Sequence, residues 1–89
     1  MLFMNIYTWE PGQRDALIKR RMEKGGNALA EGVKTVGEWF ALGGCRGFIL
    51  LETHDPKAAI TSAMVWNDLM EEEIIPLVET SAVFPDEKG

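Results

Sequence analysis

The stretch that decides the fold is residues 45–56, Cys-Arg-Gly-Phe-Ile-Leu-Leu-Glu-Thr-His-Asp-Pro. Its unbroken apolar run, residues 48–51, indicates a strand over residues 45–53 that is covered on both faces and therefore lies in the centre of a sheet. Asp55 and Pro56 then supply the N-cap and the first position of a helix, which we expect to continue to about Leu69. A central strand that leads directly into a helix is thus the first unit of the fold.

The start of the chain has the same order of elements. Residues 2–9 form a second strand whose two alternating sets are both mostly apolar, so this strand is also expected to be central. It stops at the turn sequence Glu10-Pro11-Gly12. Residues 13–24 follow with a weak helical pattern and a basic end, which suits the negative pole of a helix, and Gly25-Gly26 supplies the stop.

Two further strands are expected at the edges of the sheet. Residues 33–42 carry polar side chains along their length, and Gly43-Gly44 indicates a tight hairpin turn from this strand into residues 45–53. Residues 74–83 form the last strand, and Pro76 places it at an edge because proline lacks an amide donor. We expect the preceding helix to end before the acidic residues 71–73, which are unfavourable at a helix C-terminus, and we interpret these residues as a solvated face.

The resulting order, βαββαβ, predicts an α+β fold: a ferredoxin-like sandwich with a four-stranded antiparallel sheet and two helices on one face. We expect residues 1–84 to form one domain and residues 85–89 to be a frayed tail. Apolar residues make up 46% of the 89-residue chain, which is more than one small core needs. Because two helices cover only one sheet face, we expect a second copy to cover the other, giving a homodimer through the sheet face, a dimeric α/β barrel.

Composition excludes several function classes. The net charge of −5 disfavours nucleic-acid binding, and the chain holds no apolar run long enough for a membrane span. We expect no signal peptide, and the single cysteine, Cys45, fits a reducing cytoplasm and excludes an internal disulfide or a multi-cysteine metal site. We expect no cofactor and no metal, because no phosphate-binding loop, metal-ligand spacing or Ser-His-Asp set occurs.

The hairpin turn predicts a candidate site on the sheet face away from the helices. A two-residue turn at Gly43-Gly44 pairs Trp39 with Phe48 and puts Arg46 on the same face. In the first strand, the aliphatic set at positions 2, 4 and 6 suits helix packing, so we expect the mixed set at positions 3, 5, 7 and 9 to face away from the helices. The predicted patch therefore consists of Asn5, Tyr7, Trp9, Trp39, Arg46 and Phe48.

This predicted patch supports three readings. In the first, its amphipathic rings and Arg46 orient a small aromatic or anionic ligand inside the barrel. In the second, the protein is a cofactor-independent monooxygenase or isomerase that uses the same pocket. In the third, the aromatic residues fill a dimer interface and the protein is purely a structural dimerisation module.

Three other residues with reactive or titratable side chains are weaker candidates for a catalytic role. His54 lies beside a helix cap, where imidazoles are commonly solvated. Cys45 follows the hairpin turn with no base placed to activate it, and Glu38 faces away from Arg46.

Four motifs together resemble a known family: the opening residues 4–11 (Met-Asn-Ile-Tyr-Thr-Trp-Glu-Pro), Gly37-Glu38-Trp39, residues 43–48 (Gly-Gly-Cys-Arg-Gly-Phe) and residues 55–58 (Asp-Pro-Lys-Ala). The chain resembles, from residue 1 to about 79, a family of short bacterial proteins catalogued as a domain of unknown function, number 3303. The resemblance implies a dimeric α/β barrel and no particular activity. The layout is also similar to antibiotic-biosynthesis-type monooxygenases and haem-degrading enzymes, but none of their catalytic residues is matched, so this likeness is a fold analogy only.

Overall fold

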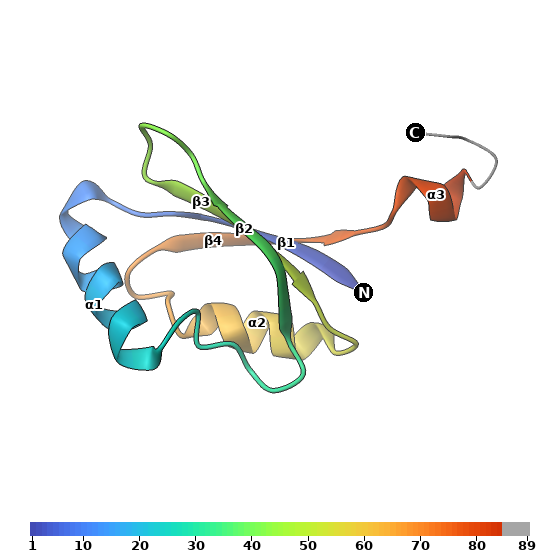
Figure 1. Ribbon diagram of the computed structural model, residues 1–89, viewed down its shortest axis with the longest axis horizontal. Coiled ribbons are helices and arrows are strands. Elements are labelled where there is room, and N and C mark those ends of the chain that lie inside the picture. The colour runs from blue at the N-terminus through green and yellow to red at the C-terminus, as the bar shows by residue number, and fades with distance from the viewer. Residues whose placement is uncertain (85–89) are drawn as a thin grey trace.

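The computed structural model describes residues 1–84 and has the predicted order of main elements (Figure 1). They are β1 (Leu2–Thr8), α1 (Arg14–Lys24), β2 (Lys34–Phe40), β3 (Arg46–Glu52), α2 (Pro56–Met64) and β4 (Glu71–Leu77). A short 3-10 turn, Pro11–Gln13, leads into α1, and the four-residue helix α3, Thr80–Val83, follows β4. The tail predicted at residues 85–89 lies outside the described residues. In the described part of the chain, no helix has the length and apolarity needed to cross a membrane.

The four strands form one antiparallel sheet in the order β2-β3-β1-β4. The predicted α+β class is therefore confirmed, and the strand order is that of a ferredoxin-like sheet. The first and third strands are central and the second and fourth are edges, as the apolar runs and Pro76 predict. The predicted register of the hairpin is also correct, since Trp39 lies opposite Phe48.

Several boundaries differ from the sequence predictions. The last strand, predicted for residues 74–83, ends at Leu77, and residues 80–83 form helix α3 instead; the strand predicted for residues 33–42 is limited to Lys34–Phe40. Strand β4 begins at Glu71 rather than at residue 74, because it pairs with β1 along its whole length, with Glu71 opposite Thr8 and Glu72 opposite Tyr7. Helix α2 ends at Met64 and continues to β4 through turns. The three glutamates thus belong to a strand, where they alternate between the two faces.

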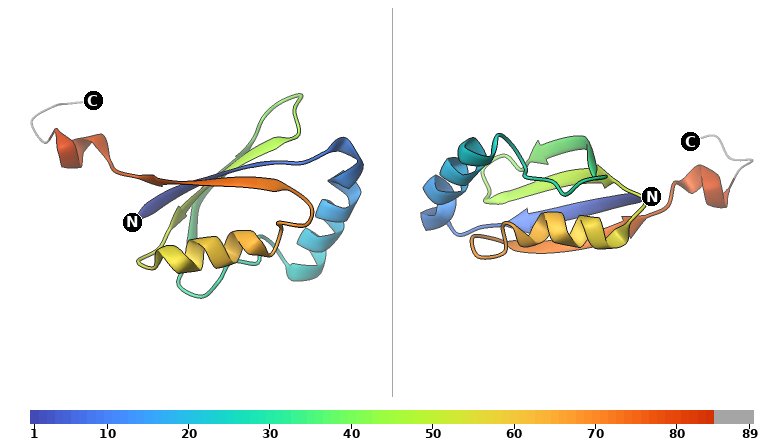
Figure 2. Two further views of the ribbon diagram at one scale, coloured as in Figure 1. Left: turned by 180° about the vertical axis from the view of Figure 1, so that it is seen from behind. Right: turned by 90° about the horizontal axis from the view of Figure 1, so that it is seen from below.

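Helices α1 and α2 both lie on one face of the sheet, as predicted (Figure 2). The residues of α2 that pack inward are small: Ala59, Ser62 and Ala63 are buried, whereas Ile60 is 54% exposed. Helix α1 buries no residue. The helices therefore contribute little side-chain volume to the core.

The sheet supplies that volume instead, and this overturns the predicted orientation of β1. Phe3, Asn5 and Tyr7 are buried on the face toward the helices, together with Ile49 and Leu51 of β3. The aliphatic set of β1, residues 2, 4 and 6, is only partly buried and lies on the other face. The small residues on α2 leave space that large aromatic side chains fill better than aliphatic ones, so the expectation for β1 is wrong.

Candidate functional site

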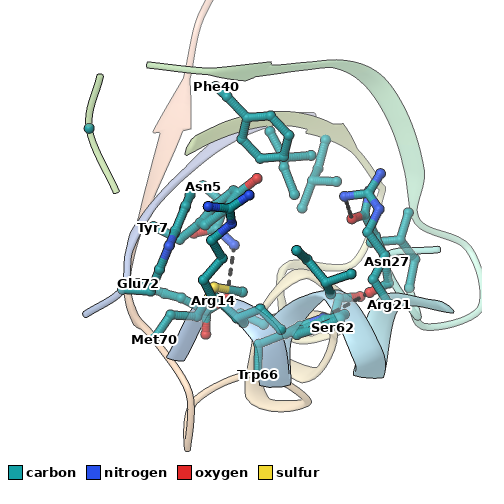
Figure 3. Close-up of a pocket in the computed structure, with 18 residues that line it drawn as sticks. Asn5, Tyr7, Arg14, Arg21, Asn27, Phe40, Ser62, Trp66, Met70 and Glu72 are labelled. Carbon is teal, nitrogen blue, oxygen red and sulfur yellow. Dashed lines mark hydrogen bonds between the residues drawn. The ribbon is translucent and has the colours of Figure 1, made fainter. Parts of the chain in front are cut away.

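A cavity of about 370 Å³ lies between the sheet and the two helices (Figure 3). Its size falls within the ~300–1,000 Å³ typical of small-molecule sites. Most of its wall is apolar and comes from Trp9, Leu17, Ile18, Leu29, Phe40, Ile49, Leu51, Ala63, Trp66 and Met70. Its polar members are Asn5, Tyr7, Arg14, Arg21, Asn27, Ser62 and Glu72. An apolar enclosure with a few convergent polar groups is the usual form of a ligand site.

The predicted patch is divided between the two faces of the sheet. Asn5, Tyr7 and Trp9 line the cavity. Trp39 and Phe48 lie opposite each other on the other face, which we call the open face. Arg46 is there too, with its guanidinium carbon 5.3 Å from the centre of the Phe48 ring. In the β1–β3 register, Phe48 lies opposite Ile6 and Tyr7 lies opposite Gly47. Phe48 and Tyr7 therefore project from opposite faces of the sheet and cannot belong to one patch.

Tyr7 packs against Gly47, which has no side chain to occupy the position of the ring. A Cβ atom at Gly47 would lie 2.3 Å from the Tyr7 ring carbon Cζ, so the ring rests directly on the glycine backbone. The Tyr7 hydroxyl donates to Glu38 Oε2 over 3.4 Å. Burial, followed by the charge of Glu38, raises the pKa of Tyr7, so the phenol stays protonated and acts as a donor.

Glu38 is held chiefly by Arg21 from α1. The two guanidinium nitrogens of Arg21 lie 2.9 and 2.8 Å from the two carboxylate oxygens of Glu38, in a bidentate ion pair. These hydrogen bonds lower the pKa of Glu38. Arg21 also donates to Asn27 Oδ1 over 3.1 Å. Glu38 thus faces away from Arg46, as predicted, and its charge is compensated within the cavity wall.

Asn5 and Glu72 form the other polar corner of the cavity. Asn5 is 4% exposed, and its Nδ2 donates to Glu72 Oε1 over 3.3 Å. The Asn5 Oδ1 atom is buried and has no hydrogen-bond partner among the described residues. Burial raises the pKa of Glu72, an effect that the hydrogen bond from Asn5 opposes. An unmatched buried acceptor costs about 1–3 kcal/mol, so a ligand with a donor at this point would remove that cost.

Of the cavity wall, the predicted patch contains only Asn5, Tyr7 and Trp9; among the residues it lacks, Glu72 is the one that the sequence could have indicated. It was interpreted as part of a solvated acidic run, and its neighbours Glu71 and Glu73 are indeed exposed. The available signal was strand alternation: extending the last strand back over the glutamates puts Glu72 on the opposite face from both neighbours. Of the weaker candidates, His54 is exposed and Cys45 is a partly buried free thiol. Residues 1–84 contain no cluster of three or more His, Cys, Asp or Glu that would hold a metal ion.

Comparisons with known proteins identify a family but no activity. No curated protein and no solved structure matches the chain. One family does match, described as a domain of unknown function, DUF3303, and the match covers residues 1–85. It extends over β1 to α3, including every residue of the cavity and of the open face discussed above. The chain therefore belongs to the DUF3303 family.

Proposed function

We propose that this protein binds a small, mainly apolar, ring-containing molecule in the cavity between the helices and the sheet. The observation that carries the proposal is the unpaired, buried Oδ1 of Asn5, a residue in the wall of an aromatic-lined cavity of about 370 Å³. An engineered apolar cavity of about 150 Å³ holds benzene, so the space here suits a molecule larger than one ring. The site lies within one protomer, on the opposite sheet face from the interior of the predicted barrel.

The polar corner indicates what the ligand carries. Asn5 Oδ1 and the Glu72 carboxylate are both acceptors, so they favour a hydroxyl or N–H donor on the ligand. On the far side of the cavity, Arg21 is already neutralised by Glu38. This arrangement favours a hydroxylated aromatic molecule over an aromatic anion.

Two probes of equal shape test this proposal. We expect 2-naphthol to bind and to quench tryptophan fluorescence, because Trp9 and Trp66 line the cavity. The isosteric 2-methylnaphthalene, which has no donor, should bind more weakly. The substitution Asn5→Leu should weaken 2-naphthol binding by about tenfold, the equivalent of one lost hydrogen bond, and leave 2-methylnaphthalene binding unchanged or tighter.

The control is Asn67→Leu, because Asn67 is exposed and is not part of the cavity wall. Equal affinity of the wild type and Asn5→Leu for 2-naphthol, or no binding of either probe, would overturn the proposal.

We also propose that two copies associate through the open face. On this face β1 and β3 present Met4, Ile6, Phe48 and Leu50, all only partly buried, and Trp39 is 53% exposed. Beyond β4 the chain extends away from the sheet with Val78, Val83 and Phe84 exposed (Figure 1). Because these side chains sit outside the core of their own protomer, a symmetric second copy would give both surfaces a partner.

The oligomeric state tests this second proposal. Light scattering at micromolar concentration should give the mass of a dimer, and Phe48→Asp should give a monomer, because a charge would be buried between two sheets. Ile60→Asp is the control: it puts the same charge at an exposed apolar position on α2, behind the sheet, and should leave the dimer intact. A monomeric wild-type chain would contradict the proposal.

The cytoplasm is the location we propose. The sequence has one cysteine, and Cys45 is a free thiol. A reducing compartment protects such a thiol from mixed disulfides. Fractionation of cells that produce the protein would test this, and recovery from an oxidising compartment would contradict it.

A further inference from the structure

We propose that Glu72 is a catalytic general base, which removes a proton from a carbon acid bound in the cavity and makes this protein an isomerase-type proton-transfer enzyme. The inference rests on the proposed ligand binding and goes beyond it, because binding requires only acceptors, whereas catalysis requires a base that is free to take a proton. It is carried by the placement of Glu72 in the cavity wall, by its lack of a bonded cation, and by the unpaired amide oxygen beside it.

Strand alternation puts Glu72, alone of three consecutive glutamates, on the cavity side. It lies directly across from Tyr7 in the sheet and beside Asn5, which donates to its Oε1. Figure 3 shows Glu72 near Asn5, Tyr7 and Met70 along one wall of the cavity. The hydrogen bond from Asn5 occupies one of its oxygens and fixes the orientation of the carboxylate. The other oxygen, Oε2, has no hydrogen-bond partner among the described residues.

Among the described residues, Glu72 is the only carboxylate in the cavity wall, and its environment is opposite to that of Glu38, which lies behind the wall residues Tyr7 and Arg21. Glu38, from β2, is bound by both nitrogens of Arg21 and is therefore a weak base. Glu72 forms no ion pair within the described part of the chain. The charged and titratable groups around it are Tyr7 from β1, and Arg14 and Arg21 from α1; α2 contributes only uncharged residues to the wall. A carboxylate that is desolvated without a bonded cation is a stronger base than one in water.

The proposed step is redox-neutral. A ligand with a C–H bond next to a carbonyl gives its proton to the Glu72 carboxylate, the C–H electron pair becomes the new carbon–carbon π bond, and the carbonyl π pair moves to oxygen. The resulting carboxylic acid of Glu72 returns the proton to a different carbon of the conjugated enolate, which restores the carbonyl and completes an isomerisation. Asn5 Oδ1 would meanwhile accept a hydrogen bond from a hydroxyl or N–H group elsewhere on the ligand.

A general base can be tested without the natural substrate, by using 5-nitrobenzisoxazole. Removal of its single ring C–H proton next to nitrogen forms a nitrile, breaks the N–O bond and releases a coloured phenolate, so the reaction can be followed by absorbance. We expect saturable turnover whose rate rises with pH through an apparent pKa above the ordinary glutamate value of 4.5. Glu72→Gln should reduce that rate by roughly 10²-fold, the usual contribution of a general base. The matched control, Glu71→Gln, changes an exposed carboxylate on the same strand and should have no effect.

Measuring 2-naphthol binding in parallel separates the two proposals. If 2-naphthol binds but the wild type and Glu72→Gln turn over the benzisoxazole at the same rate, the base is overturned and the binding proposal stands. If 2-naphthol does not bind, both fail. Glu72→Asp provides a second variant: as a base it should retain the pH-dependent rate at a lower kcat, and loss of the pH dependence in a folded Glu72→Asp protein would count against the assignment.

Discussion

Gly47 determines where Tyr7 lies, and through Tyr7 it shapes the cavity. The phenol ring packs against the glycine, on the face toward the helices, and its hydroxyl donates to Glu38. Gly37 has the same relation to Trp39 on the open face, where a Cβ atom would lie 2.5 Å from the indole ring. These two strand glycines therefore provide space for an aromatic ring to pack directly on the backbone, rather than flexibility.

A methyl group at residue 47 should therefore disturb the cavity. Gly47→Ala places a carbon where the Tyr7 ring now lies, so the ring must move and its contact with Glu38 is lost. We expect the free energy of unfolding in urea to fall by about 1–3 kcal/mol, as for other overpacked sites, and 2-naphthol binding to weaken. Gly12→Ala is the control, because its added Cβ would have no atom within 4 Å and residue 12 is not part of the cavity wall. Equal stability of the two variants would contradict the close packing of the Tyr7 ring on Gly47.

At this scale the sequence predicted three of the cavity residues but not their surroundings. Asn5, Tyr7 and Trp9 were correctly grouped, because alternation within a strand is fixed by geometry. Their separation from Trp39, Arg46 and Phe48 could not be predicted from β1, since both of its sets are mostly apolar. The choice depended on the small side chains of a helix that begins more than forty residues later.

Helix α1 is attached to the rest of the protein mainly through two adjacent arginines. It buries no residue of its own. Arg20 donates to both oxygens of Asp68, at 2.6 and 2.8 Å, and to the carbonyl oxygen of Val65. Arg21 holds Glu38 on β2. Because neighbouring residues point about 100° apart around a helix, the two ion pairs anchor α1 in different directions over the cavity.

Removing one anchor should loosen α1 more than the remainder of the fold. Glu38→Gln keeps the size of the side chain and removes its charge, and we expect a loss of about 1–2 kcal/mol, between the values for exposed and buried ion pairs. Faster hydrogen exchange at the amides of α1 is the measurement. Glu23→Gln is the control, because the Lys19–Glu23 pair is exposed and its charged atoms are 3.9 Å apart. Equal exchange in the two variants would contradict this account.

The same anchor should respond to acid. Arg21 lowers the pKa of Glu38 below its ordinary 4.5, so the ionised carboxylate stabilises the folded chain fully above that value. As the pH falls through the lowered pKa, Glu38 takes up a proton and the contribution is lost. The stability difference between the wild type and Glu38→Gln should therefore be largest near neutral pH and should shrink below about pH 4.

Among the elements, the central strands and the starts of both helices followed from local signals. The side chain of Asp55 accepts from the amide of Lys57 at the start of α2, and Pro56 occupies the first position, as the cap sequence predicts. The start of β4 did not follow, because acidic residues have low strand propensity and only pairing with β1 draws them into the sheet. Tertiary pairing here overrode the local preference.

For the whole molecule, the sequence predicted the α+β fold and strand order, but it put on one sheet face six residues that the structure divides between the two faces. The prediction assumed that an apolar excess belongs to a shared interface. In the structure, four of the aromatic residues line a cavity within the protomer: Tyr7, Trp9, Phe40 and Trp66. Trp39 and Phe48 lie on the open face instead. A count of apolar residues measures how much surface must be covered, but not whether a protein chain or a ligand covers it.

The two-residue alternation of the sheet also bears on how this protein can evolve. Along β1, positions 3, 5 and 7 face the helices, while positions 2, 4 and 6 belong to the open face. A mutation at an odd-numbered position of β1 changes the cavity side of the sheet, and a mutation at an even-numbered position changes the open face. The proposed ligand site and the proposed dimer interface thus use alternate positions of one short strand, so that selection can change either surface while the other is conserved.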